Sequence, residues 1–113
     1  MFKLSKKREI RLPVVIPVPQ DEGRIMKYEA MATFEILPTP EHDAVYAAGG
    51  TDLDLLNRAV TGWGEDQFQD DEGKPLLYNE QSKAALFGVS YVRSAFIDAY
   101  MRAYSGREGA RKN

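Results

Sequence analysis

The sequence predicts an α+β fold, in which an N-terminal antiparallel β-hairpin precedes about four helices, with a small hairpin between the second and third helices. Apolar residues alternate with a period of two before residue 38, which is typical of half-buried strands. After residue 38 they recur at helical spacing, and Gly, Pro and Asn separate the helical stretches. A chain of 113 residues allows one hydrophobic core. We therefore expect a single domain over residues 1–106, with the hairpin at about 9–37 and the helical part at about 39–105.

The predicted hairpin has one apolar face and one polar face. Pro13 and Pro17 each remove a backbone donor, so the first strand should lie at a sheet edge. The turn Gln20–Gly23 connects it to the second strand. Two strands alone are marginal in water, so helices of the same chain or another subunit should cover the apolar face. The alternating apolar residues are Ile10, Leu12, Val14, Ile16 and Val18 in the first strand, and Met26, Tyr28, Ala30, Ala32, Phe34 and Ile36 in the second.

Capping residues predict the first two helices. The first should begin at Thr39–Pro40, with the threonine as N-cap and the proline as the first helical residue, and end at Gly49–Gly50. The second should begin at Thr51 or Asp52 and end at Thr61–Gly62. The acidic turn Asp70–Gly73 lies between apolar residues and predicts the tip of the small hairpin.

The last two helices carry the clearest signals. Asn79 should cap a short helix over residues 80–87, and Ser90 should cap a longer helix that ends at Gly106. Ile97 and Met101 widen the apolar stripe of the longer helix, so it should lie between two packing layers or contribute to an interface. We expect residues 107–113 to form a basic flexible tail. The stripe consists of Val92, Ala95, Phe96, Ala99, Tyr100, Ala103 and Tyr104.

Composition excludes several kinds of chemistry. The chain is 43% hydrophobic and 28% charged, which is typical of a globular domain. It contains no cysteine, so disulfides, thiolate metal sites and cysteine nucleophiles are excluded. His42, the single histidine, falls in the first turn of a predicted helix, where we expect a solvated or capping role. No apolar run approaches the ~20 residues of a membrane span, and the N-terminal segment has no signal-peptide core. We expect no membrane insertion.

No motif in the sequence supports catalysis. If Gly73 is aligned with the glycine of a calcium loop, Phe68 and Asn79 occupy positions that require an aspartate and a glutamate. Gly49–Gly50 precedes a helix but lacks the lysine of a phosphate-binding loop. No serine occurs in a nucleophile elbow. We therefore expect a protein that is not an enzyme and that holds no cofactor and no metal.

Charge is unevenly distributed along the chain. The first thirteen residues carry five basic residues against Glu9, whereas residues 41–72 carry nine acidic residues against Arg58. Solvated termini explain this most simply. The alternatives are nucleic-acid-binding arms and head-to-tail self-association, in which a basic end meets the acidic middle of the next copy. The basic segment lacks interleaved aromatic residues, so we do not expect nucleic-acid binding.

The order of segments resembles that of small tail assembly chaperones encoded by long-tailed bacteriophages and prophages. The resemblance covers roughly residues 10–104, and its specificity lies in order and spacing. It rests on Val60-Thr61-Gly62-Trp63, the turn Asp71-Glu72-Gly73-Lys74-Pro75-Leu76, Tyr78-Asn79-Glu80, Tyr91-Val92-Arg93-Ser94-Ala95-Phe96-Ile97-Asp98-Ala99-Tyr100, and a basic tail that ends in Lys112-Asn113.

This resemblance implies a non-enzymatic function. Such chaperones bind the tape-measure protein, shield its apolar stretches, help recruit tail tube subunits and leave before the tail is complete. It implies action in the host cytoplasm, absence from the mature virion, and homo-oligomers. Two alternatives remain: a structural virion component, such as a head–tail joining or tail completion protein, and a small nucleic-acid-binding regulator that uses Lys3, Lys6, Lys7, Arg8 and Arg11.

A chaperone of this kind needs an apolar surface for its client. We expect a groove near the last helix to hold an amphipathic helix of the client. The candidate anchors, spaced at helical intervals, are Val92, Phe96, Tyr100 and Tyr104. If these side chains belong to the core instead, replacing Tyr100 or Tyr104 with alanine should unfold the domain.

Overall fold

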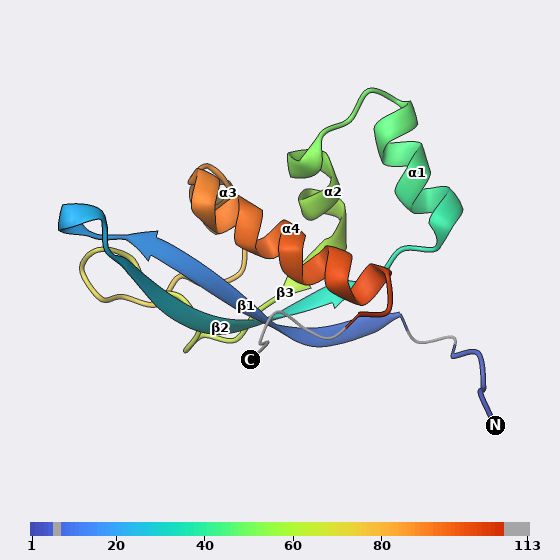
Figure 1. Cartoon of the computed structure of the whole chain (residues 1–113), viewed down its shortest axis with the longest axis horizontal. Helices are drawn as coiled ribbons and strands as arrows, with labels where there is room; N and C mark the ends of the chain where they lie inside the picture. The colour runs from blue at the N-terminus through green and yellow to red at the C-terminus, as the bar shows by residue number, and fades with distance from the viewer. Residues whose placement is uncertain (6–7, 108–113) are drawn as a thin grey trace.

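A long β-hairpin with helices on one of its faces organises the fold (Figure 1). The computed structural model describes residues 1–5 and 8–107, so all of the tail predicted at 107–113 except Arg107 lies outside the described residues. The α+β prediction is confirmed. The elements are β1 (Glu9–Pro19), a 3-10 turn (Asp21–Gly23), β2 (Ile25–Glu35), α1 (Thr39–Ala47), α2 (Asp52–Ala59), β3 (Val60–Gly62), α3 (Glu80–Phe87) and α4 (Ser90–Tyr104).

β1 is an edge strand, as the prolines predict. The sheet order is β1-β2-β3, and β1 pairs antiparallel with β2 in a register that sets Glu9 opposite Glu35. At one end of the ladder the Ile36 amide donates to the Arg8 carbonyl at 2.9 Å. The backbone N–H and C=O groups of the even-numbered residues of β1 therefore point toward β2, and those of the odd-numbered residues point away from it. The odd-numbered prolines 13, 17 and 19 therefore lie on the outer edge. They remove donors from that edge without interrupting the ladder.

The predicted end of the second helix is wrong, because the residues after Ala59 form the strand β3. We expected this helix to reach residues 61–62, but α2 ends at Ala59 and the next three residues pair with β2, with Val60 opposite Phe34 and Gly62 opposite Thr33. Helix propensity is low for valine, threonine and glycine, and the open edge of β2 offers backbone partners. Tertiary pairing therefore ends the helix one turn early.

The turn between α1 and α2 requires glycine. Gly49 has a φ of 84°, and a Cβ at Gly50 would lie 2.4 Å from the Val45 carbonyl oxygen. Thr51 then caps α2 in a capping box, in which its amide donates to the Asp54 carboxylate at 2.8 Å. The predicted start of α2 is confirmed.

The predicted N-cap positions of the other helices agree with the structure to within one residue. The Asn79 side chain accepts from the Ser82 amide at 2.8 Å, which confirms the cap of α3. Thr39 and Ser90 were expected to be N-caps, but each is the first residue of its helix, and Pro38 and Val89 occupy the cap positions without side-chain hydrogen bonds. The backbone is extended at Pro38 and Val89 and becomes helical at the next residue, so each helix begins one position earlier than predicted.

The small hairpin predicted between α2 and α3 is present and short. Gln69 and Pro75 form an antiparallel bridge, and on either side of it the Leu76 amide donates to the Phe68 carbonyl and the Asp70 amide to the Lys74 carbonyl, both at 2.8 Å. The Asp70 carboxylate accepts from the amides of Glu72 and Lys74, both at 2.9 Å, and this holds the turn closed. The Trp63 indole fixes the base of the segment by donating to the Leu76 carbonyl at 2.8 Å.

α4 forms the core by packing across the hairpin. The Phe96 ring lies 6.0 Å from Phe34 of β2, 5.1 Å from Phe87 of α3 and 5.9 Å from Phe68 of the segment between β3 and α3. These aromatic pairs, which are tilted, stacked and edge-on, add to the stabilisation that burial provides. The remaining fully buried large side chains are Val14, Leu55, Leu56, Val60 and Tyr100.

The helices cover only part of the hairpin. Met26 and Tyr28 share a face with buried Ala30, yet they are 48% and 52% exposed. Ile25, at the start of β2, is 64% exposed. The sequence predicts that helices of the same chain or another subunit cover the apolar face. In the single chain its distal end projects beyond the helical layer (Figure 1).

Four charged side chains join the open ends of the hairpin to the helices. Glu35 of β2 pairs with Arg8 and with Arg58 of α2, the latter at 2.7 Å. Glu41 of α1 pairs with the same two guanidinium groups, each at 3.0 Å. The hydrogen bond from Arg58, together with the charges of both arginines, holds the pKa of Glu35 below its usual value. This ionic cluster therefore connects β1, β2, α1 and α2.

Replacing Phe96 with alanine should lower the free energy of unfolding by about 3–5 kcal/mol, because the cavity adds to the loss of apolar burial. Denaturant titration followed by circular dichroism measures this loss. The control is Ser94→Ala, an exposed position on the same helix, which should change stability by less than about 0.5 kcal/mol. A loss below about 1 kcal/mol for Phe96→Ala would contradict the described core.

Replacing Glu35 with glutamine should lower the free energy of unfolding at pH 7 by roughly 1–2 kcal/mol. A carboxyl with a lowered pKa stabilises the fold above its ordinary value of about 4.5, and this contribution is lost as the pH falls through the folded-state pKa. The difference between wild type and variant should therefore shrink below that pH. Denaturation at several pH values tests this, with Glu65→Gln as the exposed control. A difference that is constant with pH would contradict it.

Candidate functional site

The structure places most of the expected anchors in the core. Val92, Phe96 and Tyr100 are buried against the sheet and neighbouring helices, and Tyr104 is half-buried. A side chain without exposed surface cannot contact a client in this conformation, so the expected groove on this stripe is not present. The apolar stripe of α4 is buried because it covers the apolar face of the hairpin.

Tyr104 belongs to an aromatic cluster around His42. The His42 ring stacks on Tyr104 at 4.1 Å and on Tyr100 at 5.8 Å. Its Nδ1 lies 3.3 Å from the Tyr100 hydroxyl, which also accepts from the Leu37 amide at 3.3 Å. Burial raises the pKa of Tyr100, so at neutral pH its hydroxyl keeps the proton that it can donate to His42. The expectation of a solvated His42 is wrong, because this side of α1 packs against α4.

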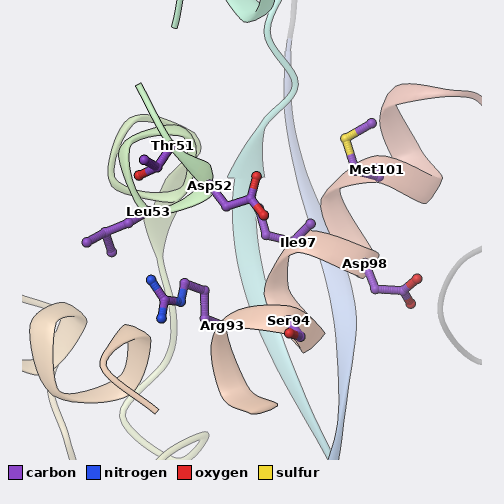
Figure 2. A pocket seen from close by; sticks show the side chains of 8 residues that line it. All are labelled: Thr51, Asp52, Leu53, Arg93, Ser94, Ile97, Asp98 and Met101. Carbon is purple, nitrogen blue, oxygen red and sulfur yellow. The ribbon is translucent and has the colours of Figure 1, made fainter. Parts of the chain in front are cut away.

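A groove lies between the start of α2 and the outer face of α4 (Figure 2). Its volume is about 500 Å³. Figure 2 shows Asp52 extending from α2 toward Ile97 of α4, while Arg93 extends from the first turns of α4 toward the side of α2. The lining residues are Thr51, Asp52, Leu53, Arg93, Ser94, Ile97, Asp98 and Met101. Leu53, Ile97 and Met101 are half-buried and pack against the core, so they provide a firm apolar wall.

The charged groups of the groove differ in how they are engaged. Asp98 pairs with Arg102 at 2.9 Å, one turn along α4. Asp52 accepts a hydrogen bond from the Tyr46 hydroxyl at 2.8 Å. Burial and this carboxylate raise the pKa of Tyr46 to about 12, so the hydroxyl remains a donor at neutral pH. Arg93 has no ion pair within the part of the chain that the structure describes.

Two smaller hollows adjoin the groove. One, of about 240 Å³, shares Leu53 and Arg93 with the groove and reaches Phe87 of α3. The other, of about 440 Å³, shares Ser94 and Asp98 with it and reaches Val15 of β1. The outer face of α4 is therefore bordered by recesses on both sides. This extended surface can bind a polypeptide through apolar contacts and rim hydrogen bonds.

The sequence contained a partial signal for this site. Ile97 and Met101 stood out because they widen the apolar stripe of α4 beyond what one layer covers. Nothing in the linear order places Leu53 of α2 opposite these two side chains. Only the tertiary packing of α2 beside α4 brings the three together.

Neither a metal cluster nor a membrane-spanning helix is found in the described ranges 1–5 and 8–107. Within them, no three His, Cys, Asp or Glu side chains are placed to share a metal ion. No helix there has the length and apolar character needed to cross a bilayer. Comparisons with family models, with curated proteins and with solved structures found no match to this chain.

Replacing Tyr100 with phenylalanine should lower the free energy of unfolding by about 1–2 kcal/mol, because the Leu37 amide and His42 lose their partner inside the fold. Thermal and denaturant unfolding measure the change. Tyr28→Phe removes an exposed hydroxyl and serves as the control, with an expected change near zero. Equal stabilities of the two variants would show that the buried hydroxyl contributes nothing.

Proposed function

We propose that this chain is a non-enzymatic chaperone of phage tail assembly, whose α2–α4 groove holds an amphipathic helix of the tape-measure protein and which helps recruit tail tube subunits. The observation that carries the proposal is the half-exposed apolar wall of Leu53, Ile97 and Met101 beside a core that is already complete. The resemblance described above supplies the identity of the client. The structure supplies a surface suited to one.

The spacing of the wall suits a helical client. Ile97 and Met101 are four residues apart on α4, so their side chains lie about one helical turn apart. A client helix with apolar residues at positions i, i+3 or i+4, and i+7 presents side chains at the same interval. Packing two such helices interdigitates their side chains, and the polar rim then accommodates the client's flanking residues.

The contacts of Arg8 weaken the nucleic-acid alternative. Its guanidinium is paired with Glu35 and Glu41 in the ionic cluster and is thus already neutralised. A phosphate-binding arm would instead need this charge available for counterion release.

The chaperone proposal also includes action in the host cytoplasm and departure before the virion is complete.

A double substitution in the groove tests the proposal. Ile97→Glu with Met101→Glu should reduce binding of the tape-measure protein from the same phage or prophage by at least about tenfold, because both carboxylates would be desolvated on docking. Co-purification and titration calorimetry measure the binding. Leu77→Glu, at another exposed apolar position, is the matched control and should bind normally. Thermal unfolding verifies that all variants fold.

Two results would contradict the proposal. The first is equal binding of the tape-measure protein by the groove variant and the wild type. The second is the presence of this chain as a stoichiometric component of purified virions, which would favour a head–tail joining or tail completion protein. Mass spectrometry of finished particles decides between a chaperone and such a component.

A further inference from the structure

We propose that copies of this chain associate head to tail, with the N-terminal arm of one copy docked on the distal end of the next. The arm is Met1–Ser5. The distal end comprises the hairpin residues Ile25–Tyr28 and the acidic segment Glu65–Glu72. This inference is independent of the α2–α4 groove, because it uses none of the residues that line it.

The two surfaces lie at opposite ends of the molecule. Figure 1 shows the N-terminus at one end of the longest axis, and the hairpin tip and the segment that follows β3 at the other. The molecule extends 46 Å along this axis. An arm at one end cannot reach the distal end of its own chain without refolding the hairpin. The partner that fits is therefore a second copy.

Both surfaces expose large apolar side chains. Phe2 and Leu4 of the arm are 84% and 87% exposed, and Ile25, Met26 and Tyr28 are each about half exposed or more. The α4 cover stops short of the distal hairpin, so Met26 and Tyr28 extend the core face as exposed apolar surface, and Ile25 adds apolar surface beside the turn on the opposite face. Exposed apolar side chains gathered at one place in this way mark interaction surfaces in soluble domains. Docking Phe2 and Leu4 there would remove both sets from water.

The charges of the two surfaces are complementary. The segment from Trp63 to Asn79 contains five carboxylates and a single lysine. Asp70 is occupied in closing its turn, but Glu65 and Asp71 are exposed and make no ion pair within the described residues. The arm carries Lys3, also without a described ion pair, and the sequence adds Lys6 and Lys7, which lie outside the described residues. Opposite charges on two exposed surfaces guide association and fix its orientation.

The free edge of β1 argues against the main competing mode of self-association. Pro13, Pro17 and Pro19 face outward on this edge, so a second copy cannot extend the sheet there through a regular ladder. Contact through side chains at the two ends remains available. Because the two surfaces differ, the interface is heterologous, and a pair of copies still offers one arm and one distal end to further copies. Association should therefore continue beyond a dimer.

Sedimentation velocity of the full chain at low and high salt tests the proposal. At about 20 mM salt the average mass should rise steadily with concentration, and at about 500 mM it should fall toward the 12.7 kDa of one chain. Lys3→Glu alone, or Asp71→Lys with Glu72→Lys, should weaken association by about tenfold. Combining the arm reversal and the end reversal in one chain should restore it. Asp43→Lys, an exposed charge reversal on α1, is the matched control and should have no such effect.

The apolar part of the contact has its own test. Phe2→Ser should weaken association at low salt without altering its dependence on salt, because the apolar part of the contact is insensitive to screening. A chain that stays monomeric at low salt and high concentration would overturn the proposal. So would a mass that saturates at a dimer, or reversals that weaken association singly without restoring it when combined. Client binding through the groove is measured separately, so either proposal can fail alone.

Discussion

The packing of α4 across the β-hairpin is the contact on which the rest of the structure depends. A two-stranded ribbon cannot hold an apolar face in water, and Phe96 covers it while touching β2, α3 and the segment between β3 and α3. One side chain thus joins elements from three parts of the chain. Because the stripe of α4 is used in this way, the neighbouring side of the helix is left to border α2, and the α2–α4 groove results.

Two polar arrangements fix the helices at the open end of the hairpin. The ionic cluster ties Glu35 and Glu41 to the same pair of arginines, and the Tyr100 hydroxyl connects the Leu37 amide to His42. Both join the end of β2 to α1, and they act on different faces of the connection. The distal hairpin has no comparable ties among the described residues and no helical cover. The molecule therefore has one firmly packed end and one projecting end, and its exposed apolar surface gathers at the projecting end, at the arm and along α4.

The separation of core and surface on α4 allows stability and binding to be varied independently. Phe96 and Tyr100 face inward, whereas Ile97 and Met101 lie on the neighbouring side, half-buried along the groove. Substitutions at the first pair act on folding, and polar substitutions at the second pair change the wall of the groove. The projecting hairpin and the arm form a third region, which lies apart from both the core and the groove.

Local patterns in the sequence determined the elements. Alternation predicted the hairpin, the outward prolines predicted its edge strand, and Asn79 and the glycines placed helix ends to within a residue or two, because these signals act through neighbouring residues. Tertiary structure alone decided that Val60–Gly62 forms a strand, that His42 is buried, and that the stripe with Val92, Phe96 and Tyr100 faces inward. In each case the deciding partner is distant in the chain: the edge of β2, the tyrosines of α4, or the hairpin face. Periodicity shows that a helix has an apolar side, but what covers that side depends on contacts that only folding brings together.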